Sequence, residues 1–260
     1  MPTFAIVSMK GGVGKTSVTL GLASAAWSRG HRVLVIDLDP QANATMGLRV
    51  DSAGFTINDV LADARPGIAS EAVQSSPWGE HVHVLAAERA LEHRNTVEGR
   101  HSSLRLRASL ASLPRSYDVV LIDCPPSLGE LTRNALSASD AALIVTEPGF
   151  FALRGAEQAL EAAEVIRSST NPLMRPAAIV VNKARPSVAE QRQRIEELRA
   201  SYGSLVSERI VPERNAIQQA EAAGMPIHAW ESPAGAELAR IFDALYRDIM
   251  PASLAMERSR

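Results

Sequence analysis

The segment from Ser8 to Ser17 reads SMKGGVGKTS and follows a short apolar run, TFAIV. A glycine-rich loop that ends in Gly14-Lys15-Thr16 has the residue types of a phosphate-binding loop. Glycines let backbone N–H groups converge on phosphate oxygens, and the helix that follows adds its partial positive charge. In such a loop Lys15 would reach the terminal phosphates of a nucleotide and Thr16 would ligate Mg²⁺. The spacing therefore predicts a nucleotide site in this segment.

This loop departs from the common pattern G-x-x-x-x-G-K-[ST] in two ways. Met9 stands where that pattern has its first glycine, and a second lysine, Lys10, follows it. Three of the 27 basic residues are lysines and the other 24 are arginines, so two of the three lysines lie in one loop. A codon preference accounts for the general excess of arginine. Keeping lysine here indicates a need for a compact, flexible point charge.

Carboxylates follow two other apolar runs. The run VLVID ends at Asp37, with Asp39 two residues later, and the run VVLID ends at Asp123. Parallel strands place their carboxyl ends at one edge of a sheet, where a loop after the first strand would also lie. The acids therefore fit a role in holding Mg²⁺ or positioning water. Taken alone, each motif can also be read as solvated acids at a strand end.

A parallel sheet covered on both faces is expected to position these groups, because the apolar runs are nearly continuous rather than alternating. The expected strands are Thr3–Ser8, Arg32–Asp37, His81–Leu85, Asp118–Asp123, Ala141–Thr146, Pro176–Val181 and Glu208–Val211. The expected helices are Lys15–Arg29, Ser103–Leu113, Leu128–Ser137, Leu153–Arg167, Val188–Ala200 and Ala234–Ile249. The stretch Arg49–Gly79 is expected to be irregular, with short helices or loops. This alternation predicts an α/β, doubly wound, mostly parallel sheet flanked by helices.

The composition excludes a disulfide-stabilised fold, a cysteine-rich metal site and a membrane-spanning segment. The chain has 260 residues, a net charge of −2 and one cysteine, Cys124. One cysteine excludes an internal disulfide framework and a cysteine-rich metal site, and Cys124 is expected to be a small packed residue. The six histidines show no metal-ligand spacing, and no apolar run is long enough to cross a bilayer. We expect a cytoplasmic protein with a single domain at 1–250 and a frayed tail at 251–260.

The loop KGGVGKTS resembles the deviant Walker A motif of the ParA/MinD family of P-loop ATPases. In that family an extra lysine opens the loop and the first glycine is dispensable. The segments DLDPQANAT and CPPSLGELTRNAL are similar to the family's switch I and switch II. The absence of a helix-turn-helix before the loop makes the chain most similar to short, Soj-like partitioning ATPases. The resemblance implies ATP and Mg²⁺ as cofactors and covers the chain to about Tyr246.

Roles for individual residues follow from the resemblance. It implies catalytic roles for Lys10, Lys15 and Asp39, with Lys10 reaching the ATP of a partner subunit in a face-to-face dimer. It implies metal-site roles for Thr16, Asp37 and Asp123. The implied nucleotide-binding residues are Lys10, Gly11, Gly12, Val13, Gly14, Lys15, Thr16, Ser17, Asn182, Pro212 and Glu213, the last three on the adenine. Phe150 and Phe151 are expected near the dimer face.

A partitioning role is also implied by the resemblance: an ATP-dependent homodimer that binds double-stranded DNA nonspecifically and positions a plasmid or chromosome cargo. A ParB-like partner would stimulate hydrolysis, and the protein would associate with the nucleoid. The candidate DNA contacts are Lys183, Arg185, Arg192, Arg194, Arg199 and Arg214. Glutamates on the same segment leave a mixed solvated face as the alternative. A MinD-like membrane regulator and a P-loop metabolic enzyme are the rival functions, and the short, apolar-poor tail disfavours a membrane anchor.

Overall fold

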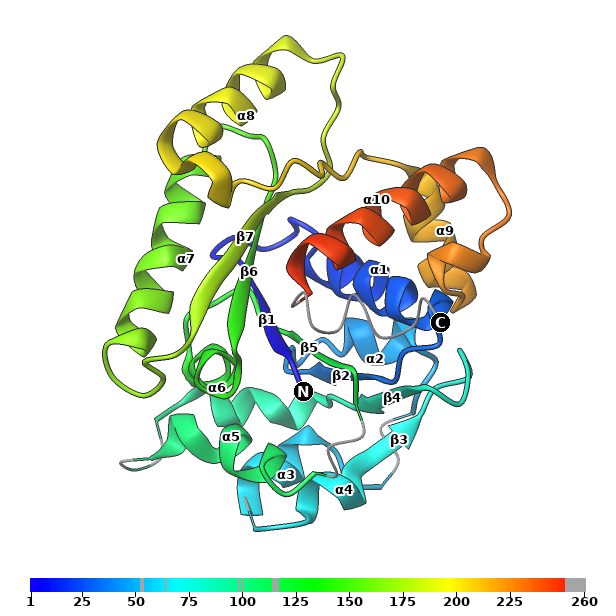
Figure 1. The fold of residues 1–260 in the computed structure, drawn as a ribbon. Helices are drawn as coiled ribbons and strands as arrows, with labels where there is room; N and C mark the ends of the chain where they lie inside the picture. The colour runs from blue at the N-terminus through cyan, green and yellow to red at the C-terminus, as the bar shows by residue number, and fades with distance from the viewer. Residues whose placement is uncertain (52–53, 64, 98, 100, 114–116, 251–260) are drawn as a thin grey trace.

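A seven-stranded sheet forms the centre of the computed structural model, which describes residues 1–51, 54–63, 65–97, 99, 101–113 and 117–250. Its strand order is β3-β4-β2-β5-β1-β6-β7 (Figure 1), and the pairs are parallel except for β3 with β4. The strands are β1 (Thr3–Val7), β2 (Val33–Asp37), β3 (Val73–Ser75), β4 (Val82–Leu85), β5 (Val119–Asp123), β6 (Ala141–Thr146) and β7 (Arg175–Val181). The doubly wound, mostly parallel sheet that the sequence predicted is confirmed.

Helices and 3-10 segments connect the strands. The α-helices are α1 (Lys15–Ser28), α2 (Asn43–Gly47), α3 (Ile57–Asp63), α4 (Ile68–Ala72), α5 (Arg105–Leu110), α6 (Glu130–Ala138), α7 (Ala152–Arg167), α8 (Ala189–Tyr202), α9 (Asn215–Ala223) and α10 (Pro233–Ile249). The 3-10 segments are η1 (Arg89–Asn95), η2 (Ser102–Leu104), η3 (Gly203–Leu205) and η4 (Ile227–Ala229).

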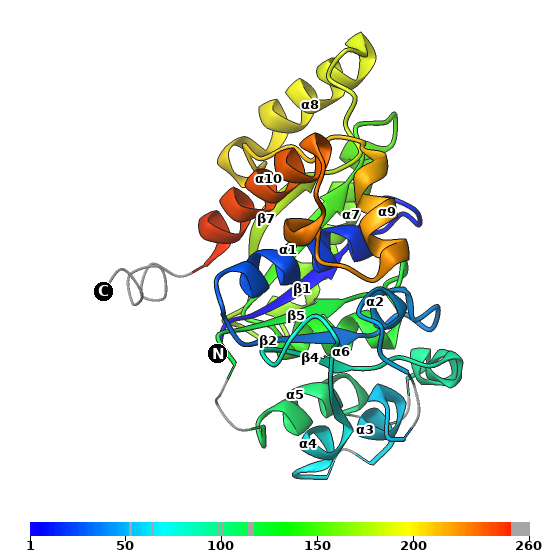
Figure 2. The ribbon, with the colours of Figure 1, turned by 90° about the vertical axis from the view of Figure 1, so that its right-hand side faces the viewer.

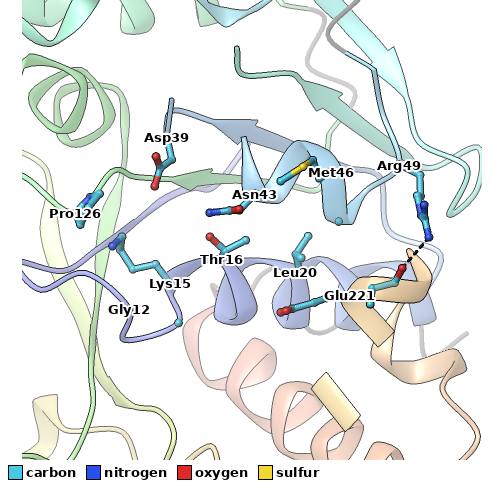
Figure 3. Close-up of a pocket in the computed structure, with 13 residues that line it drawn as sticks. Gly12, Lys15, Thr16, Leu20, Asp39, Asn43, Met46, Arg49, Pro126 and Glu221 are labelled. Carbon is cyan, nitrogen blue, oxygen red and sulfur yellow. Dashed lines mark hydrogen bonds between the residues drawn. The ribbon is translucent and has the colours of Figure 1, made fainter. Parts of the chain in front are cut away.

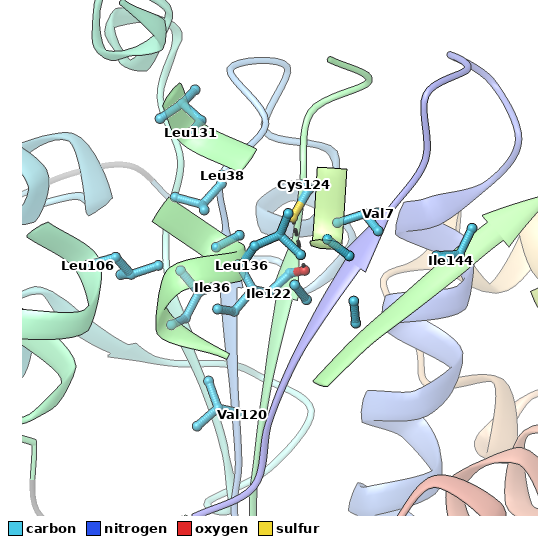
Figure 4. Close-up of a cluster of buried hydrophobic side chains, with 14 of the residues drawn as sticks. Val7, Ile36, Leu38, Leu106, Val120, Ile122, Cys124, Leu131, Leu136 and Ile144 are labelled. Carbon is cyan, nitrogen blue, oxygen red and sulfur yellow. Dashed lines mark hydrogen bonds between the residues drawn. The ribbon is translucent and has the colours of Figure 1, made fainter. Parts of the chain in front are cut away.

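The alternation of side chains along each strand divides the interior into two cores. Phe4 and Ile6 face a core under α1, α2, α9 and α10, whereas Ala5 and Val7 face a core under α3 to α8. Figure 2 shows the two layers of helices, and Figure 4 shows part of the second core. Burial of both faces explains why the strand sequences are apolar without a break.

Helix α10 packs an apolar stripe against the first core. Leu238, Phe242, Leu245 and Ile249 are all buried there. A Cβ atom on Gly21 of α1 would lie 2.3 Å from the Phe242 ring, so the two helices approach as closely as a glycine permits. Ser232 begins the helix by accepting a hydrogen bond from the Gly235 N–H.

Two expectations differ from the structure. The segment Glu208–Val211 is not a strand, and that prediction was wrong. Only isolated bridges form nearby, Ile179 with Val206 and Ala184 with Pro212, and Pro212 has no N–H with which to continue a ladder. Within the irregular stretch Arg49–Gly79 the structure adds an edge strand, β3, to the short helices that were expected.

The topology brings the candidate site together. Strand β1 lies between β5 and β6, so the loop that leaves its carboxyl end lies where the strand order diverges. In the pairing of β2 with β5, Asp37 stands directly opposite Asp123. Of the described helices, none combines the length and apolar character needed to cross a membrane.

Candidate nucleotide-binding site

The loop between β1 and α1 takes a conformation that requires glycine. Gly12 and Gly14 have φ values of 79° and 86°, in the left-handed region. A Cβ atom on Gly14 would also lie 2.2 Å from the Asn182 Nδ2 atom, closer than any side chain tolerates. Backbone turns of this kind direct successive N–H groups toward one point, which is the geometry of an anion site.

A hollow of about 510 Å³ lies against this loop (Figure 3). Lys15 is only 7% exposed and lies on the hollow together with Thr16. The remaining lining residues are Gly12, Gly14, Leu20, Asp39, Asn43, Met46, Gly47, Arg49, Pro126, Glu221 and Ala222. The loop, the segment after β2 and the segment after β5 therefore share one hollow, as the sequence motifs predicted.

Thr16 and Asp123 form a hydrogen-bonded pair at the edge of the sheet. The Thr16 hydroxyl donates to Asp123 Oδ2 at 2.7 Å, and the Thr19 hydroxyl donates to Asp123 Oδ1 at 3.1 Å. A hydroxyl and a carboxylate are hard oxygen donors of the kind that Mg²⁺ takes. The described residues contain no cluster of three His, Cys, Asp or Glu that could hold a metal by itself. The pair thus fits a Mg²⁺ ion that takes its other ligands from phosphate and water.

Asp37 holds the segment that carries Asp39. Its Oδ1 atom accepts from the Asp39 N–H at 3.1 Å, and its Oδ2 atom accepts from both the N–H and the hydroxyl of Thr45 at 2.8 Å. Asp37 is fully buried, whereas Asp39 faces the hollow and accepts from the Gln41 N–H at 3.0 Å. The structure therefore gives Asp37 a positioning contact, and its part in a metal shell stays a prediction.

Two buried carboxylates face each other across β2 and β5. Burial raises the pKa of Asp37, where the Thr45 hydrogen bonds oppose the shift. Burial and the nearby Asp37 raise the pKa of Asp123, where Thr16 and the Lys15 charge oppose the shift. The raised pKa values mean that ionisation of both acids is disfavoured at this edge, and a bound cation would favour their charged forms.

Lys10 is directed away from the hollow that its neighbours form. Its Nζ atom contacts the Glu147 carboxylate, which follows β6, and the Lys10 side chain is 49% exposed. Lys15 and Thr16 line the hollow, but Lys10 is not among its described lining residues. The two lysines of one loop thus have different surroundings, and the role of Lys10 toward a partner subunit stays a prediction.

Asn182 and Lys183, which directly follow β7, contact the backbone carbonyls of the loop. The Asn182 side chain donates to the carbonyls of Val13 and Gly14 at 2.8 and 3.4 Å, and Lys183 Nζ donates to the Gly12 carbonyl at 2.5 Å. Lys183 therefore lies at the nucleotide loop, although the sequence grouped it with the candidate DNA contacts. The Glu213 N–H donates to the Ala184 carbonyl at 2.9 Å, which brings the Pro212–Glu213 segment beside the same strand end.

Comparison with known proteins identifies the family. A family model described as an AAA domain matches residues 1–175. The chromosome partitioning protein ParA of Caulobacter vibrioides is 34% identical over 229 residues, which cover 86% of this chain and 85% of the relative. The chain belongs to the ParA-like family of ATPases.

Two further relatives extend the comparison of this ParA-like chain. The sporulation initiation inhibitor protein Soj of Bacillus subtilis is 32% identical over 229 residues, covering 86% of this chain and 88% of the relative. The structure of cobyrinic acid a,c-diamide synthase from Mycobacterium smegmatis with bound ADP and magnesium superimposes with a TM-score of 0.79 and 26% identity. That alignment covers 96% of this chain and 98% of the other.

Several lining residues of the ParA-like site were not found from the sequence. Arg49 has a left-handed φ of 54°, and its Nη2 atom donates to the Ala222 carbonyl of α9 at 2.8 Å. This contact brings Glu221 to the hollow from a distant part of the chain. Pro126 belongs to the CPPS sequence after β5, so the motif could have identified it, whereas nothing local indicates the Arg49 contact.

The arginines predicted to bind DNA have various intramolecular contacts. Arg185, Arg194 and Arg214 pair with Glu213, Glu197 and Glu237 at 2.8, 2.8 and 2.9 Å. Arg192, Arg199 and Arg214 line a second hollow, of about 310 Å³, between α8 and α10. The ParA-like chain thus brings three of the six candidate basic residues together.

Cys124 and the paired phenylalanines occupy opposite environments. Cys124 is fully buried, as expected for a packed residue, and burial raises the pKa of its thiol. Phe150 and Phe151 are 71% and 58% exposed, and the Arg194 guanidinium lies 5.4 Å from the Phe150 ring centre. An exposed aromatic pair beside Glu147 is a candidate contact surface.

Proposed function

We propose that this protein is an ATP-hydrolysing switch that dimerises on Mg-ATP, binds double-stranded DNA nonspecifically and positions a DNA cargo. Relatives named ParA and Soj support the partitioning role. The protein would then be cytoplasmic and associated with the nucleoid, and a ParB-like partner would stimulate its hydrolysis. The observation that carries the proposal is the divergence of Lys10 and Lys15 within one loop.

The loop and the two strand ends have distinct tasks in this proposal. Gly11, Gly12, Val13, Gly14 and Ser17 contribute the phosphate-binding backbone, and Lys15 neutralises the terminal phosphates of its own ATP. Thr16 and Asp123 would hold Mg²⁺, which supplies charge neutralisation at the phosphate oxygens when bound. Asp39 orients the attacking water, and the hydrogen bonds of Asp37 keep Asp39 in place.

Lys10 completes the partner's site in this proposal. Charge builds on the phosphoryl oxygens during transfer, and a cation that arrives only after assembly makes hydrolysis depend on the dimer. The Lys10 side chain is exposed and held by one carboxylate, so its amine is free to exchange that contact for phosphate. ATP then joins two subunits, and hydrolysis separates them.

The Asn182 amide supports adenine as the base. Both of its N–H bonds are directed at loop carbonyls, so the remaining Oδ1 atom can only accept a hydrogen bond. The 6-amino group of adenine offers a donor to that atom, whereas the 6-oxo group of guanine does not. Pro212 and Glu213, beside the same strand end, would supply backbone on the other side of the base.

Light scattering after gel filtration tests the dimer directly. We expect wild type to elute as a dimer with Mg-ATP and as a monomer with ADP or without nucleotide. The Lys15→Ala variant should remain monomeric in every state, and GTP should not replace ATP. A chain that stays monomeric in Mg-ATP while binding the nucleotide would contradict the proposal.

The similarity to a diamide synthase favours a metabolic ligase as the second candidate function. The two candidates differ in what ATP turnover requires. A ligase would hydrolyse ATP only when its small-molecule acceptor is present, with cobyrinic acid as the first acceptor to test. The switch would instead show slow turnover that increases with protein concentration as dimers form.

A further inference from the structure

All three lysines of the chain lie at the nucleotide loop. Lys10 and Lys15 belong to the loop, and Lys183 reaches it from the end of β7, with Nζ 2.5 Å from the Gly12 carbonyl oxygen. Every other basic side chain is one of the 24 arginines. The third lysine therefore lies at the same loop as the first two and contacts its backbone, unlike the arginines on α8.

Asn182 and Lys183 together contact three consecutive carbonyls, and we call this pair of residues the carbonyl clamp. Asn182 donates to Val13 and Gly14, and Lys183 donates to Gly12. A loop that directs its N–H groups at an anion must direct its carbonyls elsewhere, and buried carbonyls need donors. Asn182 supplies donors to the Val13 and Gly14 carbonyls, and Lys183 supplies one to the exposed Gly12 carbonyl.

The backbone around the clamp is fixed by its own hydrogen bonds. The Asn182 N–H donates to the Thr146 carbonyl at 2.8 Å, and the Ala184 N–H donates to the Val211 carbonyl at 3.1 Å. Between them Lys183 has a φ of 54°, a left-handed conformation that costs a non-glycine residue about 1 kcal/mol. The flanking hydrogen bonds hold this conformation, which turns the Lys183 side chain to the loop.

The fit between loop and clamp is close. A Cβ atom on Gly14 would lie 2.2 Å from Asn182 Nδ2 and 3.6 Å from Lys183 Cε. A compact ammonium group meets one carbonyl in this space, whereas the planar guanidinium fork of arginine requires more room and a flat acceptor pair.

We propose that Asn182 and Lys183 are positioning residues that hold the loop in its anion-binding conformation before the nucleotide arrives. The clamp lowers the ordering cost of binding, because the left-handed turns at Gly12 and Gly14 are already formed. The Lys183 charge also adds to the positive field at the phosphates. This inference rests on the proposed nucleotide site, and it moves Lys183 from the DNA surface to that site.

Nucleotide affinity of Lys183→Met tests the clamp, because methionine keeps an unbranched apolar stem and removes the donors and the charge. We expect the Kd for a fluorescent ATP analogue and for ADP to rise about tenfold, the size of one lost charge-assisted hydrogen bond. Turnover at saturating ATP should stay within about threefold, so the loss appears in KM rather than kcat. The variant Lys183→Gln, which keeps a donor without charge, should lie between Met and wild type.

The matched control is Arg167→Met, on α7, whose guanidinium pairs with Glu164 at 2.7 Å and not with the loop. It should leave nucleotide affinity unchanged. Hydrogen exchange of the loop amides without nucleotide should accelerate in Lys183→Met but not in this control, a change that general destabilisation would not confine to the loop. Thermal unfolding verifies that both variants fold.

Unchanged nucleotide affinity of Lys183→Met, together with weaker DNA binding at saturating ATP, would overturn the inference and return Lys183 to the DNA surface. Failure of the wild type to bind any nucleotide would instead refute the proposed function. The two failures are distinguished by the wild-type titration alone.

Discussion

Lys10 stands in the nucleotide loop but contacts a carboxylate of its own chain, Glu147. Both side chains are partly exposed, and pairs of this kind stabilise a protein by about 0–1 kcal/mol. The contact is strong enough to hold the resting position of Lys10 and weak enough to be replaced by a phosphate. The phosphates of ATP carry several negative charges and attract the Lys10 amine more strongly than the single Glu147 carboxylate does.

The Glu147→Gln substitution should therefore favour the dimer. With the competing carboxylate removed, we expect the dimerisation constant in Mg-ATP to tighten about threefold and the unfolding free energy to change by less than about 0.5 kcal/mol. Analytical ultracentrifugation with and without ATP measures the change. The control is Glu164→Gln, which removes an exposed ion pair with Arg167 on α7. A weaker dimer in Glu147→Gln, with the control unchanged, would show that Glu147 supports assembly instead.

At the scale of elements, the contact between α1 and α10 fixes the helix that opens at Lys15. Phe242 packs directly over Gly21, and the Arg29 side chain pairs with Asp243. His31 Nδ1 lies 2.9 Å from the Tyr246 hydroxyl at the far end of α1. These contacts hold the middle and the carboxyl end of α1 against α10.

Two glycines inside helices give opposite predictions for substitution by alanine. In Gly21→Ala the new methyl group would meet the Phe242 ring, so we expect a loss of about 1–3 kcal/mol in unfolding free energy. In Gly155→Ala, on α7, nothing lies within 4 Å of the new atom, so we expect a gain of about 0.5–1 kcal/mol from helix propensity. Urea unfolding of both variants checks the pair. Equal effects would disprove the close approach of α1 and α10.

His228 makes the same region sensitive to pH. Burial lowers the pKa of His228 and Arg29 acts in the same direction, while Asp243, 3.3 Å from Nε2, opposes them. Because the pKa is lower in the folded state, the unfolded state binds more protons just below pH 6.5, and stability falls as the pH falls through that range. We expect thermal unfolding midpoints to decline below about pH 6.5 in wild type. The decline should be smaller in His228→Gln; an equal slope would exclude His228 as its source.

At the scale of the whole molecule, the candidate DNA surface lies around the hollow between α8 and α10, far from α3 and α4 (Figure 1). Arginines neutralise phosphates, and each contact contributes to the salt dependence of binding. Two copies in a dimer would double the effect of one side chain. The low net charge of the chain makes such a local surface necessary.

The Arg199→Ala substitution should weaken DNA binding uniformly across sequences. We expect the slope of log K against log salt to fall in magnitude by about 2 per dimer, one phosphate contact from each subunit. Titrations of a labelled duplex at several salt concentrations, with ATP, measure the slope. Arg65→Ala serves as the control, because Arg65 lies beside α4 and pairs with Asp63 and Glu71. An unchanged slope in Arg199→Ala would remove this arginine from the surface.

The sequence predicted most of the fold and the meeting of the loop with the segments after β2 and β5, and the reasons are physical. Apolar runs indicate the six buried strands, and the spacing of the glycines indicates the loop at residues 10–17. The edge strand β3 has only three residues and depends on its pairing with β4, so no local pattern indicates it. Lys183 and Arg49 each contact a residue more than 170 positions away in the sequence, and each has a left-handed backbone conformation. Composition does not reveal either feature.

We propose that ATP switches the molecule into its DNA-binding form through Lys10. Co-sedimentation with DNA, in ATP, ADP and no nucleotide, on wild type and Lys10→Ala, tests it most directly. We expect wild type to sediment with DNA only in ATP, and Lys10→Ala to lose ATP hydrolysis. Equal DNA binding in all three nucleotide states would contradict the account.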